Sequence, residues 1–196
     1  MTSKSTINRL QVTDLSLGWR LFLAFLSGPL MWLVWRSLDS LQPFDDPDSW
    51  ILFGFSPPGF LLGVLVLVPF VSNRRFLVIR AVALVVAAMI IEVLVVGLAS
   101  EFEIIPAVLF GTILIAIVAG LVAPIKITPR FLVYVAGAGL ISGLSFHLIL
   151  YHVWNFFCLN SCPWWNDVAF VSGWIVWHMA ICAAIYFGRR RPNSPT

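Results

Sequence analysis

The sequence predicts an all-helical (all-α) polytopic membrane protein, a six-transmembrane-helix bundle with both termini cytoplasmic. Hydrophobic residues make up 60% of the 196 residues and charged residues only 11%, and the mean hydropathy is +0.97. Soluble domains are about 45–50% apolar and about 25% charged, so a soluble chain of this size could not bury so much apolar surface. The third observation is that the apolar residues form long runs with the charges between them.

Each of the six predicted helices is one of these runs. A helix needs about 20 apolar residues to cross a hydrocarbon core of about 30 Å. The runs that meet this length are residues 17–35, 50–71, 76–99, 104–124, 131–152 and 168–188. We expect residues 1–16 to form a cytoplasmic segment rather than a cleaved signal, because no small-residue cleavage site follows the first run. Residues 189–196 are the expected cytoplasmic basic tail.

The charged residues alternate between the two sets of connecting segments. Basic residues such as Arg20, Arg74 and Arg130 lie on one side, and acidic residues such as Asp45 and Glu101 lie on the other. The positive-inside rule places the basic set in the cytoplasm and predicts a plasma membrane protein of the bacterial inner-membrane type. The net charge of +3 then reflects helix ends that face anionic lipid, and no nucleic acid is expected as a partner.

Prolines interrupt the first two runs. Pro57 and Pro58 fall inside the second run, and Pro29 follows Gly28 midway along the first. Proline removes a backbone donor, so we expect a kink or a break. Broken membrane helices can offer freed backbone groups to a ligand, which makes the backbone at Pro57 and Pro58 a candidate part of a site. A kink absorbed by helix packing is the alternative.

Three ionisable side chains lie within the predicted helices. Glu92, His147 and His178 are roughly 10, 8 and 15 Å deep when counted from the outer helix ends at about 1.5 Å per residue. Glu92 and His147 continue stripes of small residues, where membrane helices make contact, so we expect them to face the bundle interior. In the fifth run this stripe includes Gly139 and Gly143, which are expected to face a neighbouring helix. Ionisable groups in hydrocarbon mark functional sites by default, so we predict that these three bind a ligand or a proton in the outer half of the membrane. The alternative is that Glu92 only ties helices together through a hydrogen bond.

The last outer loop contains two cysteines. Cys158 and Cys162 face the side of the membrane where disulfides persist, so a structural disulfide is expected. A redox-active pair is the alternative, although thioredoxin-like centres have two intervening residues rather than three. Cys182 falls within the sixth run and is expected to be a small packing residue.

Two further chemistries remain open. His147 and His178 lie on neighbouring runs and could hold a haem or a transition metal, so both cofactor and metal are left unknown. Ser142 and His178 lie at a similar depth, which is similar to the serine–histidine dyad of rhomboid proteases. That family has a glycine where this chain has Leu140.

The predicted function is a non-enzymatic membrane subunit that binds or transports a small solute or ion. Its expected partners are the lipid bilayer and other membrane subunits or further copies of the chain. In size and span number it is similar to the substrate-capture subunits of energy-coupling-factor transporters, whose first span docks a partner through small residues, matched here by Ala24 and Gly28. One alternative is an accessory or assembly subunit without a ligand. A further alternative is an intramembrane haem, metal or thiol redox protein.

Overall fold

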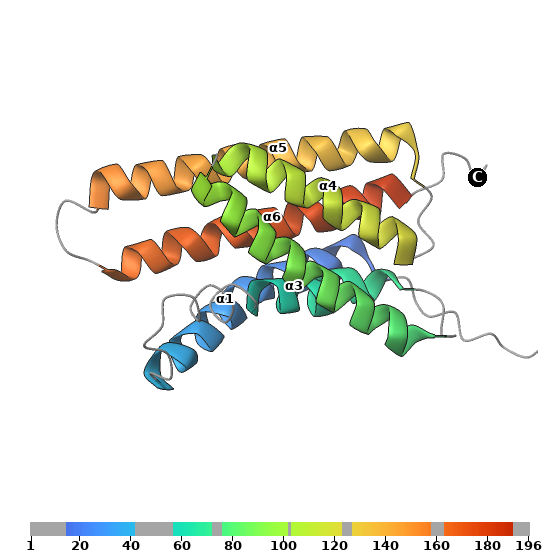
Figure 1. The fold of residues 1–196 in the computed structure, drawn as a ribbon, viewed down its shortest axis with the longest axis horizontal. Coiled ribbons are helices and arrows are strands. Elements are labelled where there is room, and N and C mark those ends of the chain that lie inside the picture. The colour runs from blue at the N-terminus through green and yellow to red at the C-terminus, as the bar shows by residue number, and fades with distance from the viewer. Residues whose placement is uncertain are drawn as a thin grey trace, which may run out of the picture.

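The fold of the chain is helical throughout the part that the structure describes. The computed structural model describes residues 15–41, 57–71, 76–101, 103–122, 127–157 and 163–189. Every regular element in these ranges is a helix, and they contain no strand (Figure 1). Of the predicted terminal segments 1–16 and 189–196, residues 1–14 and 190–196 lie outside the described residues, as do Cys158 and Cys162.

Five long helices account for most of the bundle. They are α1 (Leu17–Leu41), α3 (Leu77–Glu101), α4 (Ile104–Val122), α5 (Pro129–Phe157) and α6 (Pro163–Arg189). Each contains an apolar stretch of 19 to 24 residues, which is long enough to cross a membrane. The all-helical class is therefore confirmed, and five of the six predicted runs correspond to helices whose ends differ from the prediction by a few residues.

The second predicted run contains a shorter, irregular helix. Pro57–Phe70 begins as an α-helix and continues as the π-helix η1 (Leu62–Leu67) and the 3₁₀-helix η2 (Val68–Phe70). A segment of this length spans about 21 Å, less than the hydrocarbon core, and residues 50–56 lie outside the described residues. Pro57 and Pro58 are the first residues of this helix that the structure describes. The kink or break expected at these prolines lies at the edge of the described residues and stays a prediction, whereas the irregular geometry lies further along.

The helices pack as a ring in which α6 is the most buried. Neighbouring pairs are α1 and α6, α6 and α5, α5 and α4, and α4 and α3. Pro57–Phe70 closes the ring because η1 contacts both α3 and α1, as Figure 1 shows. Half of the apolar stretch of α6 is buried inside the bundle, against 28% to 39% of the apolar stretches of the other four long helices. A polar side chain on the inner face of α6 is therefore enclosed by several helices.

Glycines set the closest helix contacts. A Cβ atom at Gly59 would lie 2.5 Å from Met89 Cα, and one at Gly63 would lie 2.6 Å from Val85 Cα. These two glycines are four residues apart, the spacing of close backbone contacts between membrane helices. They hold Pro57–Phe70 directly against the backbone of α3.

The predicted small-residue stripe of α5 packs in the same way over part of its length. A Cβ atom at Gly139 would lie 3.1 Å from Leu109 Cα, and one at Gly143 would lie 3.0 Å from Ile105 Cα. The prediction that Gly139 and Gly143 face a neighbouring helix is therefore confirmed. That neighbour is α4.

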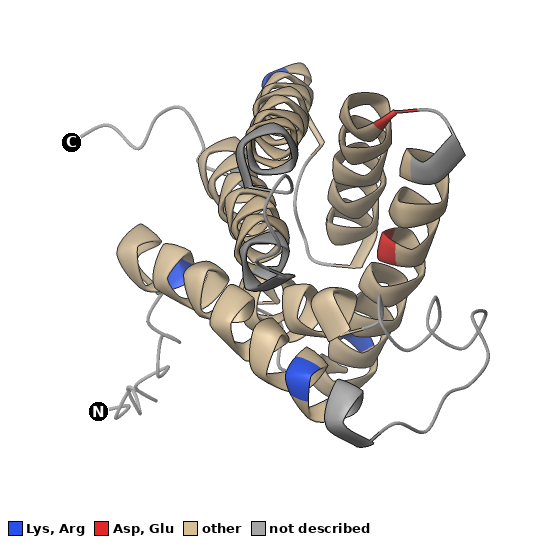
Figure 2. Ribbon diagram, turned by 90° about the vertical axis from the view of Figure 1, so that its left-hand side faces the viewer, with Lys and Arg blue, Asp and Glu red and all other residues tan. Residues whose placement is uncertain are grey.

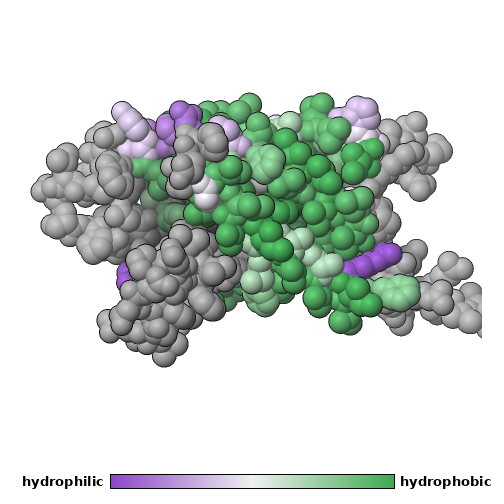
Figure 3. Space-filling view, in the orientation of Figure 1, coloured by the Kyte–Doolittle hydropathy of each residue, from purple (hydrophilic) through white to green (hydrophobic). Residues whose placement is uncertain are grey.

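The outer surface of the bundle is apolar. Figure 3 shows a broad hydrophobic band, with the polar residues gathered toward the two ends of the molecule. Large side chains such as Leu121, Val133 and Val78 are at least 70% exposed. In the described helices the charged residues are sparse (Figure 2). Such a surface is suited to lipid rather than water, which supports the membrane assignment.

Arg20 joins the start of α1 to the end of the short segment. Its guanidinium is almost fully buried, donates from Nε to the Leu15 carbonyl (2.9 Å) and from Nη1 to the Pro69 carbonyl (3.0 Å), and lies 4.2 Å from the centre of the Phe70 ring. A buried charge is tolerated only with such partners. Arg20 therefore has a packing role besides the orienting role that the sequence suggested.

Candidate functional site

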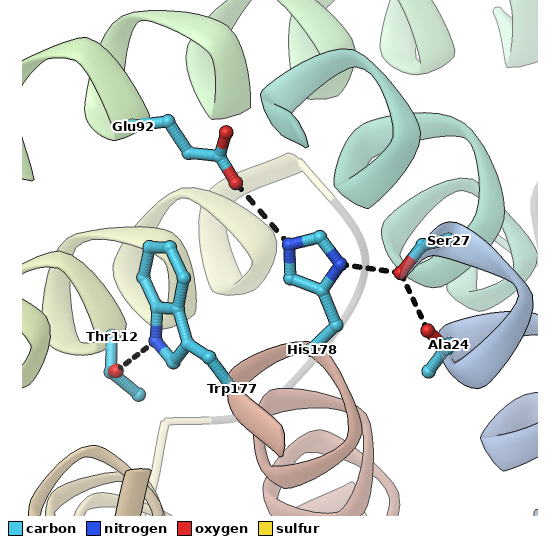
Figure 4. Close-up of polar contacts among 6 residues, drawn as sticks. All are labelled: Ala24, Ser27, Glu92, Thr112, Trp177 and His178. Atoms are coloured by element: carbon cyan, nitrogen blue, oxygen red, sulfur yellow. Dashed lines mark hydrogen bonds and ion pairs between the residues drawn. The ribbon is translucent and has the colours of Figure 1, made fainter. Parts of the chain in front are cut away.

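Three polar side chains from three helices meet inside the bundle (Figure 4). Glu92 comes from α3, His178 from α6 and Ser27 from α1, and each is at most 1% exposed. Glu92 Oε1 lies 3.2 Å from His178 Nε2, and His178 Nδ1 lies 2.7 Å from Ser27 Oγ. We call this connected group the Glu92–His178–Ser27 chain.

The local sequence of α3 and α6 explains why two of these side chains point inward. Glu92 shares a buried helix face with Ala88, four residues earlier, because residues at this spacing lie one above the other. His178 is flanked one turn away on each side by Trp174 and Cys182, and both are buried. The prediction that Glu92 faces the interior of the bundle is confirmed.

Ser27 was not predicted from the sequence. It is the only hydroxyl side chain between residues 18 and 36, which is the one signal that could have indicated it. Its neighbour Gly28 brings α1 against α6, since a Cβ atom there would lie 2.2 Å from Ile175 Cγ1. Gly28 and the fully buried Ala24 thus face their own bundle, which contradicts their expected role in docking a partner.

The hydrogen bonds of Ser27 determine where the protons of the Glu92–His178–Ser27 chain lie. Ser27 Oγ donates to the Ala24 carbonyl, and a hydroxyl has only one hydrogen to donate. We infer that His178 Nδ1 carries a proton and donates it to Ser27 Oγ. Nε2 then either accepts a proton from neutral Glu92 or is itself protonated beside a Glu92 carboxylate. In both arrangements one proton lies between Nε2 and Oε1.

The surroundings of His178 allow both arrangements. Burial in an apolar bundle favours the neutral pair, because separated charges lose their hydration. The rings of Trp174 and Trp177 each lie 6.0 Å from the imidazole, centroid to centroid, and indole rings stabilise a nearby cation. A proton can therefore shift between Glu92 and His178 without leaving an isolated charge.

The Glu92–His178–Ser27 chain lies near the middle of the apolar helices. Ser27 and His178 stand at the midpoints of the apolar stretches Leu17–Ser37 and Val168–Gly188, about 15 Å from either end. Glu92 lies closer to the end of its own stretch, Leu77–Ala99, but helical side chains tilt toward the N-terminus of their helix. That tilt brings its carboxyl group to the level of the imidazole.

His147 does not join this group. Its side chain is exposed on the outer face of α5, where its ring stacks on Tyr151 at 6.3 Å. The prediction that His147 faces the bundle interior was wrong because positions four residues apart advance by about 40° around a helix. Gly139 and Gly143 contact α4, and by His147 the same stripe has turned to the outer surface.

The dyad of Ser142 with His178 was also wrong. Ser142 is buried but donates its hydroxyl hydrogen to the Ala138 carbonyl of its own helix at 2.7 Å. The two ring nitrogens of His178 already have partners, Nδ1 with Ser27 and Nε2 with Glu92. The serine that contacts His178 comes from α1 rather than from α5.

A second polar pair ties α6 to α4 beside the site. Trp177 Nε1 donates to Thr112 Oγ1 at 2.7 Å, and Thr112 Oγ1 donates to the Val108 carbonyl at 2.7 Å. Both side chains are buried. This pair fixes the indole of Trp177 next to the imidazole of His178.

The haem, metal and thiol alternatives stay open. Among the described residues, no three His, Cys, Asp or Glu side chains converge in a group that could hold a metal ion. Cys182 is a buried free thiol, as expected of a packing residue. The predicted disulfide between Cys158 and Cys162 falls outside the described residues and stays a prediction.

Comparisons of the chain with protein-family models, with curated proteins and with solved structures found no match.

Proposed function

We propose that this chain is a six-span protein of the bacterial plasma membrane that binds a proton at the Glu92–His178–Ser27 chain. The proton serves the binding or transport of a small solute or ion. The observation that carries the proposal is the contact between Glu92 Oε1 and His178 Nε2, because both side chains are buried in the middle of an apolar bundle. Ionisable pairs at membrane depth are typical of proton relays in transporters.

The direction of the helices supports the proposed topology. The helices α1, α3 and α5 run one way, whereas Pro57–Phe70, α4 and α6 run the other way (Figure 1). Arg20, Arg80 and Arg130 lie near the starts of α1, α3 and α5, and so at the same end of the bundle. The positive-inside rule assigns this end to the cytoplasm, with both chain termini on that side.

The linkage of three helices gives a bound proton a structural effect. Each hydrogen bond of the Glu92–His178–Ser27 chain joins a different pair of helices. The Glu92–His178 bond joins α3 with α6, and the His178–Ser27 bond joins α6 with α1. A change in proton number alters the donors and acceptors at both contacts. Proton uptake therefore changes how α1 and α3 are held against α6, which is the coupling that a transport subunit needs.

Infrared spectroscopy of the protein in membranes tests proton binding at Glu92. We expect a C=O stretching band of a protonated carboxylic acid in the wild type, shifted in D₂O and sensitive to pH, and we expect Glu92→Gln to remove it. Glu103→Gln is the matched control, because Glu103 is exposed. A band that survives in Glu92→Gln, or that is missing in the wild type at every pH, contradicts the proposal. An accessory subunit without a ligand would keep its function in Glu92→Gln.

The order of the three side chains favours a second candidate, an intramembrane acyl hydrolase. A serine, a histidine and an acid are joined in this order in enzymes that activate a serine nucleophile. Activation here requires that His178 Nδ1 gives up its proton and accepts the Ser27 hydrogen, which in the structure is donated to the Ala24 carbonyl. Ser27 is buried, so a substrate reaches it only if α1 moves away from α6. Such a hydrolase is expected to react covalently with a fluorophosphonate probe, and Ser27→Ala is expected to abolish the labelling. Wild-type protein that stays unlabelled in native membranes removes this candidate.

A further inference from the structure

The short helix Pro57–Phe70 changes its hydrogen-bond spacing just before Pro69. The π-helix η1 ends where the Val68 N–H donates to the Gly63 carbonyl, five residues earlier. The 3₁₀-helix η2 follows, in which each N–H donates to the carbonyl three residues earlier. Its last hydrogen bond joins the Val71 N–H to the Val68 carbonyl at 2.9 Å. Proline has no N–H, so Pro69 donates to neither pattern.

Three successive carbonyls lose their helical donor at this change. An N–H at position 69 would reach the carbonyl five, four or three residues earlier in a π-, α- or 3₁₀-helix, and these carbonyls belong to Val64, Leu65 and Val66. The donor before Pro69 is bonded to the carbonyl that precedes these three. The donor after Pro69 bonds, in 3₁₀ spacing, to the carbonyl that follows them. The helix is therefore held by the fewest backbone hydrogen bonds at Val64–Val66, and helices bend where their ladder of hydrogen bonds is interrupted.

The parts of the short helix on either side of Val64–Val66 are held by different helices. On one side, Gly59 and Gly63 lie directly against the backbone of α3. On the other side, the Pro69 carbonyl accepts from Arg20 Nη1 of α1 at 3.0 Å, and the Phe70 ring lies 4.2 Å from the same guanidinium. The weakly bonded stretch thus separates a part packed on α3 from a part held by α1.

Cys182 of α6 lies behind the Arg20 contact. Its side chain is fully buried, and Arg20 is close enough to interact electrostatically with its thiol. The helix η1 contacts α6 as well as α1 and α3. Cys182 is about one helical turn from His178, toward the end of the bundle at which Arg20 lies. Movement of the Pro69 end away from α1 therefore uncovers the face of α6 that leads to His178.

We propose that Val64–Phe70 is a gate that is hinged at the carbonyls of Val64–Val66 and held shut by Arg20. When it opens, Pro69 and Phe70 move away from α1, whereas Gly59 and Gly63 stay on α3. The hinge and the Arg20 contact do not depend on the proposed function. The use of the gate as a route for protons or solute to His178 rests on that function, which assigns the Arg20 end of the bundle to the cytoplasm.

The reactivity of Cys182 tests the Arg20 contact. Cys158→Ser with Cys162→Ser leaves Cys182 as the only cysteine, and a fully buried thiol reacts only when the structure opens locally. In this background we expect Arg20→Leu to raise the rate of alkylation by N-ethylmaleimide in native membranes roughly tenfold, which corresponds to about 1.4 kcal/mol. Arg130→Leu is the matched control, because Arg130 is exposed at the same end of the bundle, and no change is expected. A Cys182 that never reacts, or an unchanged rate in Arg20→Leu, contradicts the gate.

Pro69→Ala tests the hinge. Alanine supplies the missing N–H, so one carbonyl of Val64–Val66 gains a hydrogen bond that bending must break. Alkylation of Cys182 is expected to slow roughly fivefold, which corresponds to about 1 kcal/mol, both alone and combined with Arg20→Leu. A rate that is unchanged or faster in Pro69→Ala overturns the hinge. If Arg20→Leu instead loosens the whole bundle, adding Pro69→Ala leaves its rate unchanged. Failure of the proposed function looks different, because it removes the infrared band of Glu92 and leaves these rates as expected.

Discussion

His178→Ala is expected to destabilise the bundle by about 3–5 kcal/mol, the cost of removing one partner from a buried ionisable pair. His178 is the central member of the Glu92–His178–Ser27 chain and makes both of its interhelical hydrogen bonds. Its loss leaves Glu92 Oε1, like Oε2, without a hydrogen-bond partner among the described residues. It also opens a cavity where a fully buried imidazole stood. Unfolding in mixed micelles of increasing SDS content measures the change. His147→Ala is the control and is expected to lie within about 0.5 kcal/mol of the wild type, since His147 is exposed.

A double substitution separates the contribution of the Glu92–His178 contact to stability from that of the surrounding residues. Glu92→Leu combined with His178→Leu removes both buried polar groups, and apolar pairs of similar size are often as stable as the ionisable pair that they replace. The double variant is therefore expected to be more stable than His178→Leu alone. If the stability losses of Glu92→Leu and His178→Leu simply add in the double variant, the two side chains do not interact and the proposed site is wrong. Proton binding is expected to be lost in the double variant, however stable it is.

Gly63→Leu is expected to destabilise the bundle by about 3 kcal/mol, the upper end of the usual cost of overpacking, because the added side chain displaces backbone at a close contact. A Cβ atom at Gly63 would lie 2.6 Å from the Cα atom of Val85, which no side-chain rotation can relieve. Val85 lies on α3 two turns before Glu92, so the clash also shifts the site. The yield of monodisperse protein and its unfolding in SDS both report the loss.

Gly137→Leu is the matched control for this packing. A Cβ atom at Gly137 on α5 meets nothing within 4 Å, so a leucine there extends into lipid. Its stability is expected to stay close to that of the wild type. If Gly63→Leu unfolds at the same SDS content as Gly137→Leu, the short segment does not pack on α3 as described.

The apolar runs predicted the long helices well because the thickness of the membrane sets the length of a spanning helix. The second run was less informative. Its composition resembles that of the other runs, but in the described residues it holds a short helix with π and 3₁₀ geometry. Hydropathy does not distinguish these helix types, since they differ in hydrogen-bond spacing rather than in composition. The spacing of Gly59 and Gly63 was the available sign of a close contact.

The site was only partly predictable from the sequence. Glu92 and His178 stand out because ionisable residues are rare in apolar helices. Ser27 does not, because serine is common at helix contacts and its partner lies 151 residues away. His147 was misplaced because a stripe of small residues was extended along α5 beyond the part that touches α4. Which side chains meet depends on helix pairing, and a single sequence does not contain that information.

The protonation of the two ring nitrogens of His178 is the most direct test of the Glu92–His178–Ser27 chain. His147→Gln and His152→Gln leave His178 as the only histidine of the three, and both replaced side chains are exposed. In ¹⁵N NMR of this variant in lipid, Nδ1 is expected to carry a proton and Nε2 to have a hydrogen-bonded signal that changes in Glu92→Gln. An Nδ1 without a proton, or an Nε2 signal unaffected by Glu92→Gln, would contradict the proposed proton between Glu92 and His178.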